Sequence, residues 1–528
     1  MVVPSRAVHG TAQKGRGQAS LLPLRRGGRE PEADRPGIGA WLAVVVVAAG
    51  VALRFWTTSH LWLDEALTVN IARLPVGRIP DALRHDGSPP LYYLALHVWM
   101  RIFGSGDAAV RALSGLFGVG TLAALPFAAR ATGARRGWAA LVLAAVSPFA
   151  VRYATEARMY SLLMLLVTLG VIALARLLRS PSVASAAAVG LVTGLALLTH
   201  YWSVFLAGVV AVWLLAVWLR HRERAALWGL AAMAAGGLLF LPWAPVFVFQ
   251  LGRTGTPWAS PATIGAPLSS VFEWAGGYRD SGQILALVLL ALAALGLFGA
   301  AVDHRRIELD LGTRPEGRAL ALGVAGTLAL ALVACAATRS AFVQRYTSVV
   351  FPLFLLLAAA GAETLLSRRV RHGILGVAVV LSLAGGLPNT GTGRTQAGVV
   401  ARAINAAASP GDVVAFCPDQ LGPSVSRLLH VGLVELTFPL GAGPQRIDWV
   451  DYAARNAAGS SAAFTQMLVS RAGAHNIWLV WSGGYRTLGT KCGDLRRLLQ
   501  TERPEGKTVV TGSGRYEEHM GLVRYPTS

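Results

Sequence analysis

The stretch IGAWLAVVVVAAGVALRF, residues 38–55, indicates the class of the whole chain. Its apolar run approaches the ~20 residues that a helix needs to cross a hydrocarbon layer. Residues 1–37 before it are polar and basic, and they are too long for the basic region of an ordinary cleaved signal peptide. We therefore predict a disordered cytoplasmic tail over 1–37 and a signal anchor over 38–55.

Further apolar segments follow along the chain. The composition agrees with a membrane protein, because 54% of the 528 residues are hydrophobic and only 14% are charged. A soluble protein carries roughly 25% charged residues. The sequence thus predicts a polytopic α-helical membrane protein of about eleven spans. The predicted spans are residues 38–55, 107–130, 137–151, 158–178, 183–200, 202–219, 226–249, 283–302, 317–337, 343–366 and 371–388.

The net charge of +21 comes largely from basic residues in the short loops between apolar segments and in the N-terminal tail. All of these loops lie on one side if the spans are counted from a cytoplasmic N-terminus, as the positive-inside rule requires. This distribution indicates a lipid bilayer as partner and no nucleic acid. Frequent Ala, Gly and Arg are typical of a GC-rich bacterial genome, so we expect a multi-pass protein of the bacterial inner (plasma) membrane. The basic loops are Arg130/Arg135/Arg136, Arg176/Arg179, Arg220/Arg222/Arg224, Arg305/Arg306/Arg314/Arg318 and Arg368/Arg369/Arg371.

One apolar run, from Leu91 to Phe103, is short for a span and follows Pro89-Pro90. If it crossed the membrane, every later loop would change sides and the basic loops would face out. We therefore expect a re-entrant or interfacial helix here.

The tail over residues 395–528 has a different pattern. The runs Val413–Phe416 and Ile477–Trp481 are typical of buried strands bounded by turns. About 130 residues can bury a core of their own, so we predict an α/β domain that an odd number of spans places outside the cytoplasm. Cys417 and Cys492 there either form a disulfide or are two unpaired core residues.

The first external loop, about residues 56–106, holds two acidic groups. It contains LWLDEA over 61–66 and HDGSPPLYY over 85–93. Carboxylates at a membrane boundary are costly unless they are paired, solvated or used. Asp64 and Glu65 either are solvated loop charges or do chemistry, because adjacent carboxylates can bind a divalent metal and one of them can serve as a general base.

A second external loop, RYATEARMY over residues 152–160, joins two apolar segments. Glu156 and Arg158 either pair with each other as a structural ion pair or offer an acid near a sugar and a cation for a phosphate. His200 follows another span on the same side, where a histidine is either structural or collected into a polar cavity.

Two arginines begin apolar segments on that side. Arg345, followed by Tyr346, either snorkels to lipid headgroups or clamps a lipid-linked phosphate. Arg111 is placed in a similar way.

Together these motifs resemble the GT-C membrane glycosyltransferases, and most nearly the family 39-like enzymes, which include protein O-mannosyltransferases and bacterial lipid A aminoarabinose transferases. The resemblance covers roughly residues 40–390, so we predict a GT-C-like catalytic module over 38–390. The motifs that match are Asp64-Glu65, Asp86 through Tyr93, Arg111 with Ser114 and Gly118, Glu156 through Tyr160, and Arg345-Tyr346.

The resemblance implies a sugar donor carried on polyprenyl phosphate and an inverting transfer to an acceptor outside the cytoplasm. Asp64 is then the general base, and cations such as Arg345 stabilise the departing phosphate. Some relatives use a divalent metal and others do not, so the cofactor stays open. The leading sugars are mannose and arabinofuranose, and the acceptor is a cell-envelope glycan, glycolipid or protein.

The main alternative is a transporter or flippase of a lipid-linked glycan. Such a protein usually shows interrupted spans in corresponding positions of two halves, and no convincing internal repeat is present. On the enzyme interpretation, the candidate catalytic residues are Asp64 and Glu65. The candidate substrate-binding residues are His85, Asp86, Tyr92, Arg111, Glu156, Arg158, Tyr160, His200, Arg345 and Tyr346.

Overall fold

Most of the described chain between residues 38 and 391 is helical, because a helix satisfies its own backbone hydrogen bonds where water is absent. The structure is a computed structural model that describes residues 38–135, 137–256, 258–430 and 432–527. The tail predicted over 1–37 lies outside the described residues. In chain order the helical elements are α1 (Ile38–Leu53), α2 (Leu63–Ala72), η1 (Val76–Arg78), α3 (Ile79–Asp86), α4 (Leu91–Phe103), α5 (Asp107–Ala131), α6 (Trp138–Ala145), α7 (Pro148–Ala154), α8 (Tyr160–Arg179), α9 (Val183–Leu197), α10 (Ser203–His221), α11 (Arg224–Leu238), η2 (Leu241–Trp243), α12 (Ala244–Arg253), α13 (Ala266–Trp274), α14 (Asp280–Phe298), α15 (Pro315–Ala337), η3 (Gln344–Val349), α16 (Phe351–Thr364) and α17 (Arg368–Gly391).

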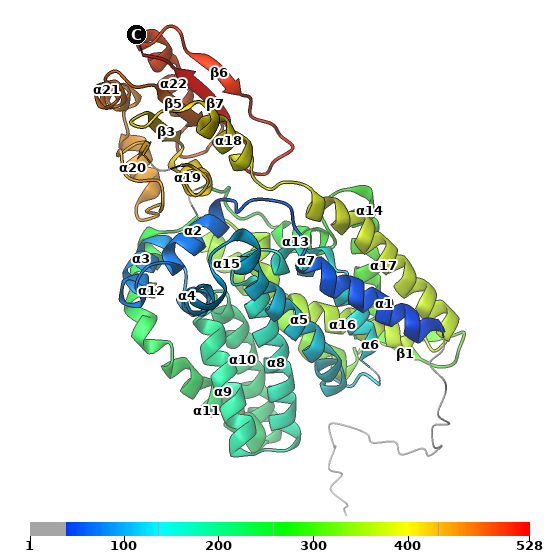
Figure 1. Cartoon of the computed structure of the whole chain (residues 1–528). Helices are drawn as coiled ribbons and strands as arrows, with labels where there is room; N and C mark the ends of the chain where they lie inside the picture. Colours follow the sequence, from blue (N-terminus) through cyan, green and yellow to red (C-terminus); the bar gives the residue numbers. More distant parts are fainter. Residues whose placement is uncertain (1–37, 136, 257, 431, 528) are drawn as a thin grey trace, which may run out of the picture. The chain divides into compact units, whose positions relative to one another are not determined.

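The long helices pack side by side (Figure 1), with α5 against α8, α9 against both α8 and α11, and α14 against α16. Small residues permit the closest of these approaches. A Cβ atom added at Gly361 would lie 1.7 Å from the backbone oxygen of Leu292, so α14 and α16 meet backbone to backbone. A short antiparallel hairpin, β1 (Gly299–Ala301) and β2 (Ile307–Leu309), follows α14.

Six helices in the described residues are long and apolar enough to cross a membrane, namely α5, α8, α10, α14, α15 and α17. A seventh is added if α11 and the η2–α12 segment, which are bent by 43° at a short break, count as one span. The helices α1, α9 and α16 are apolar but shorter. The prediction of about eleven spans is therefore not confirmed, although a multi-pass helical architecture is.

Besides the span 226–249, which is bent between α11 and η2, two predicted spans are broken in the structure. The segment 137–151 splits into α6 and α7, because the Ser147 hydroxyl caps α7 by accepting from the Ala150 backbone N–H at 3.3 Å and Pro148 begins the new helix. The segment 343–366 starts as the 3-10 helix η3 and becomes α-helical only at Phe351. Both errors arise because apolar composition alone does not show where a helix is interrupted.

The short apolar run at Leu91–Phe103 is a helix, α4, with the bounds expected for it. It ends at Gly104, whose φ of 81° lies in the left-handed region that favours glycine. Its placement at the membrane interface stays a prediction.

The chain after residue 395 forms an α/β region, which we call the C-terminal region. Its five strands have the order β4-β3-β5-β7-β6, with β3, β4 and β5 parallel and β7 antiparallel to both β5 and β6. The strands expected at 413–416 and 477–481 are β3 and β5. The elements of this region are α18 (Ala397–Ala407), β3 (Val413–Cys417), η4 (Asp419–Leu421), α19 (Gly422–Ser426), β4 (Val434–Thr437), α20 (Tyr452–Ala458), α21 (Ser461–Ala472), β5 (Ile477–Trp481), α22 (Lys491–Glu502), β6 (Lys507–Val510) and β7 (Gly521–Tyr525).

The two faces of this sheet bury two separate cores, as the alternation of side chains along a strand requires. Val413 and Ala415 belong to the core that includes α21 and α22, whereas Val414 and Phe416 belong to the core that includes α18. Cys417 at the end of β3 forms a disulfide with Cys492 in α22. The paired alternative for these two cysteines is the one that the structure contains.

Candidate active site

Asp64 lies in the first turn of α2, and its carboxylate faces η3. Its Oδ2 atom is 3.2 Å from Nη2 of Arg345, and both side chains are largely buried. The Asp64 backbone oxygen accepts a hydrogen bond from the Thr68 hydroxyl at 2.7 Å, which fixes this turn. The structure thus brings together two residues that are far apart in sequence and that the sequence analysis assigned to catalysis and to phosphate binding.

Glu65, the neighbour of Asp64, points into the protein. Its carboxylate receives two hydrogen bonds from Arg111, at 2.7 and 2.5 Å, and one from the Ala157 backbone N–H at 2.9 Å. Burial alone would raise the pKa of the Glu65 carboxyl, but Arg111 and Arg394 outweigh it and hold that pKa below its usual range. Glu65 and Arg111 are therefore bound to each other rather than presented to a substrate.

Glu156 and Arg158 each contact other residues. Glu156 forms ion pairs with Arg152 at 3.4 Å and with Arg394 at 3.9 Å. Arg158 instead donates to the hydroxyls of Thr68, at 2.8 Å, and of Tyr93, at 3.2 Å. The structural ion pair considered from the sequence is replaced by two separate sets of contacts.

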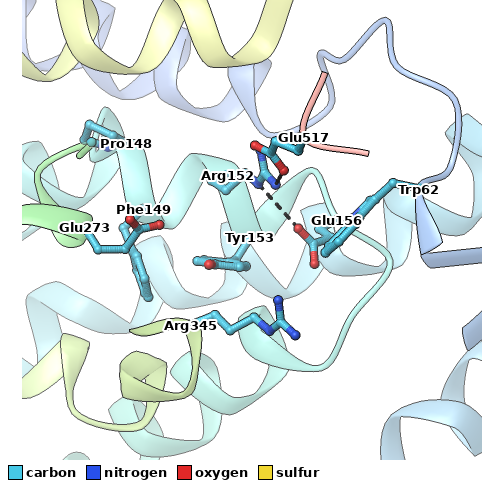
Figure 2. A pocket seen from close by; sticks show the side chains of 10 residues that line it. Trp62, Pro148, Phe149, Arg152, Tyr153, Glu156, Glu273, Arg345 and Glu517 are labelled. Atoms are coloured by element: carbon cyan, nitrogen blue, oxygen red, sulfur yellow. Dashed lines mark hydrogen bonds and ion pairs between the residues drawn. The ribbon is translucent and has the colours of Figure 1, made fainter. Parts of the chain in front are cut away.

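A cavity of about 350 Å³ opens beside these groups (Figure 2). Its polar wall carries two guanidinium groups and three carboxylates, so it suits a ligand with both anionic and hydroxyl groups. Figure 2 shows Arg345 reaching into the space below Tyr153, with Arg152 and Glu156 joined by a dashed line above it. The cavity is lined by Trp62, Pro148, Phe149, Arg152, Tyr153, Glu156, Glu273, Gly276, Arg345 and Glu517.

An aromatic group adjoins Arg345. The ring of His200 lies 4.9 Å from that of Tyr346 and 6.0 Å from that of Tyr160. Burial, together with the charges of Arg158 and Arg345, lowers the pKa of His200 to about 3. Since its Nδ1 accepts from the Trp202 backbone N–H at 3.1 Å, His200 is a neutral structural acceptor at physiological pH.

Of the candidate residues, Glu156 and Arg345 line the cavity, and the others, Asp64 among them, do not. The Tyr92 hydroxyl bonds Ser114 at 2.8 Å in the helical core. Asp86 accepts from the Tyr93 hydroxyl at 2.7 Å, and its burial raises the pKa of this carboxyl. His85 pairs with Asp448 of the C-terminal region at 2.9 Å, where both side chains are exposed.

The structure adds cavity residues that the sequence analysis did not select. Arg152 and Tyr153 belong to the loop already singled out for Glu156, and Trp62 belongs to the motif of Asp64, so proximity in sequence was a usable signal. Glu273 in α13 and Glu517 in the C-terminal region had no such signal, because they reach the cavity only through the tertiary fold.

A divalent metal was left open from the sequence. Among the described residues, no group of three or more His, Cys, Asp or Glu side chains is placed to hold a metal ion.

Comparison with known proteins supports the architecture. Residues 87–246 match the model of the dolichyl-phosphate-mannose-protein mannosyltransferase family. ArnT from Cupriavidus metallidurans in the apo state superimposes with a TM-score of 0.59 at 14% identity, over 92% of this chain and 98% of that one. The chain has the GT-C fold.

Two further GT-C structures agree. ArnT from Cupriavidus metallidurans bound to undecaprenyl phosphate gives a TM-score of 0.59 at 16% identity, over 93% of this chain and 99% of that one. The Archaeoglobus fulgidus oligosaccharyltransferase in complex with Zn and sulfate gives a TM-score of 0.51 at 12% identity, over 83% of this chain and 67% of that one. No curated protein sequence matches the chain.

Proposed function

We propose that this GT-C protein is a membrane glycosyltransferase that moves a sugar from a polyprenyl-phosphate donor to a cell-envelope acceptor on the extracytoplasmic side of a bacterial inner membrane. The observation that carries the proposal is the Asp64–Arg345 pair, 3.2 Å apart, beside a polar cavity that Arg345 lines. The match to the mannosyltransferase family model and the fold shared with ArnT bound to undecaprenyl phosphate support the same donor class.

The reaction needs one base and one anion-binding group. The Asp64 carboxylate takes the proton of the acceptor hydroxyl while that oxygen forms its bond to the anomeric carbon. The bond from the anomeric carbon to the phosphate oxygen breaks, and its electron pair leaves with polyprenyl phosphate. Attack opposite the leaving group inverts the anomeric centre.

The departing phosphate is stabilised by arginine. Arg345 and Arg152 line the same cavity. Arg345 binds the phosphate through two parallel N–H donors, whereas Arg152, whose N–H donors face carboxylates, adds its positive charge. When the donor phosphate binds Arg345, the Asp64 carboxylate is released from its ion pair and becomes available to the acceptor. The ion pair thus couples donor binding to activation of the base.

Sugar and acceptor specificity belong to the same proposal. Mannose, the sugar in the description of the matching family, and arabinofuranose are the two donors to be tried first. The carboxylates of Glu156 and Glu273 face the cavity and supply acceptors for sugar hydroxyls.

The test is transfer of radiolabelled sugar from polyprenyl phosphate into membrane acceptors, with wild type compared with Asp64→Asn at matched expression. We expect the variant to lose about 100-fold or more of the transfer rate, the contribution of a general base. Asp81→Asn, the same change at an exposed carboxylate of α3, is the control and should retain activity. Equal transfer by wild type and Asp64→Asn would remove Asp64 as the base.

A further inference from the structure

Two consecutive glutamates of the C-terminal region reach the candidate active site. Glu517 and Glu518 lie in the connection between β6 and β7. The Glu518 backbone N–H donates to the Arg394 oxygen at 2.9 Å, and the Gln396 N–H donates to the Glu518 oxygen at 3.0 Å. This connection is therefore fixed by backbone hydrogen bonds to the segment that follows α17.

Arg394 itself joins this connection to the interior of the helical part. Its side chain donates to the Thr155 backbone oxygen at 2.9 Å and to the Thr155 hydroxyl at 2.6 Å. It also lies 3.9 Å from carboxylate oxygens of Glu65 and Glu156. A buried cation thus helps to set the position of residues 517 and 518 relative to the cavity.

Glu517 holds Arg152. Nη1 and Nη2 of Arg152 donate to the two carboxylate oxygens of Glu517 at 2.9 and 2.6 Å, the bidentate geometry that fixes a guanidinium most firmly. On its other side, Nε of Arg152 lies 3.4 Å from Glu156. Figure 2 shows Arg152 between these two carboxylates at the rim of the cavity.

Glu518 contacts the start of α2. Its buried carboxyl accepts from the Ser424 hydroxyl at 3.2 Å and also interacts with the Thr395 hydroxyl and the backbone N–H of Leu63. Leu63 is the first residue of α2, and Trp62 before it gives this helix no side-chain cap. Glu518 thus places a buried carboxyl beside an end of α2 that has no side-chain cap, one residue before Asp64.

We propose that Glu517 and Glu518 are positioning residues of the glycosyl-transfer site. Glu517 orients Arg152 for the donor phosphate, and Glu518 holds the turn of α2 that carries Asp64. This inference rests on the proposed function, and it makes the C-terminal region an integral part of the catalytic apparatus rather than an appended domain.

The two residues act on different kinetic constants. Glu517→Gln removes the charge that orients Arg152, so the KM for the polyprenyl-phosphate sugar should rise about tenfold with a smaller change in kcat. Glu518→Ala removes the acceptor at the start of α2, so kcat should fall on the order of tenfold or more because the base is misplaced. Glu518→Gln keeps the acceptor oxygen and should restore kcat.

A double-mutant cycle separates this role from a structural one. If Glu517 acts through Arg152, the pair Arg152→Ala and Glu517→Gln should give the same donor KM as Arg152→Ala alone. Glu505→Gln, at an exposed position in the same region, is the matched control and should leave both constants unchanged. Melting temperatures of the purified full-length variants show whether each is folded. If Glu518→Ala does not fold, the donor KM of Glu517→Gln and the double-mutant cycle test the proposal.

The proposal is overturned if the donor KM of Glu517→Gln is unchanged or lowered, or if the effects in the cycle are additive. The proposed function then still holds as long as the wild-type protein transfers sugar. Wild-type protein that transfers no sugar overturns the proposed function and this inference with it. The two failures are therefore distinguishable in one set of assays.

Discussion

The Asp64 carboxylate and the Arg345 guanidinium form an ion pair, with Oδ2 and Nη2 3.2 Å apart. Arg345 also lies over the rings of Trp258 and Tyr346, with its guanidinium carbon 5.2 and 5.8 Å from their centroids. The cation is thus held between aromatic faces with one carboxylate as its anion. A donor phosphate entering the cavity would compete with Asp64 for it.

Arg345→Lys tests this competition. Lysine keeps the charge but loses the planar fork and the stacking, so we expect transfer to fall at least about tenfold, mainly through a higher donor KM. Arg402→Lys, at an exposed position of α18, is the matched control and should be silent. Unchanged donor KM in Arg345→Lys would show that the phosphate binds elsewhere.

Glu65→Gln should act on stability more than on chemistry. The change leaves Arg111 buried without its counter-charge, and breaking a buried ion pair costs about 3–5 kcal/mol. We expect a clear drop in melting temperature in detergent, with activity per folded molecule reduced less than in Asp64→Asn. If instead the protein melts as wild type and transfer is abolished, Glu65 belongs to the reaction.

Stability should fall as the pH rises through the range set by Glu518. Burial raises the pKa of Glu518 to about 8, so the folded protein holds a proton that the unfolded chain releases near its ordinary pKa of about 4.3. The groups that face it are Thr395, Ser424, the Leu63 N–H and Asp64. The contribution of Glu518 to the free energy of unfolding is complete below the pKa of the unfolded chain. It is lost as the pH rises to the pKa of the folded protein.

The measurement is melting temperature against pH for wild type and Glu518→Gln. The difference between the two curves should grow in favour of the variant from about pH 5 to about pH 8, because glutamine cannot ionise. Parallel curves would show that Glu518 does not titrate in this range.

Because His200 is neutral, it should not contribute to the pH dependence of sugar transfer. Because the pKa of His200 is lowered to about 3, its protonation cannot produce an acid limb near pH 6. His200→Gln should therefore leave the pH at which transfer falls to half unchanged, even if the rate is lower. A shift of that limb in the variant would contradict the assignment.

The disulfide gives a chemical test of the expected location of the C-terminal region. Alkylation without reductant should leave Cys417 and Cys492 unmodified in protein from the membrane, and reduction should expose both. Cys335 is buried in the helical part and serves as the internal reference after denaturation. Two thiols that react without reductant would place this region in a reducing compartment.

The parts of the fold that depend on local pattern could be predicted from the sequence. The apolar run of β5 has the expected bounds, and the long helices α5 and α8 agree closely with the spans expected there. The break at Ser147–Pro148 was missed because the residues on both sides of it are equally apolar. In the site, Asp64 and Arg345 were recognised separately, each from its place at a helix end.

The rest of the site depends on contacts between distant segments. Glu65 and Asp64 are adjacent and chemically similar, and only the tertiary structure pairs Glu65 with Arg111 and Asp64 with Arg345, a residue of the cavity wall. No sequence motif marks Glu517. Its role depends on the isolated β-bridge between Thr395 and Glu518, which brings this segment to the site. Such relationships cannot be read from spacing along the chain.

The lining of one cavity by Trp62 and Glu517 has a consequence for biosynthesis. Nearly the whole described chain separates the two residues, so the site cannot assemble during synthesis of the helical part alone. The lining is complete only after the C-terminal region has been synthesised and has folded against the helical part. On the proposed function, a nascent or prematurely terminated chain therefore lacks a complete site and does not consume the lipid-linked donor.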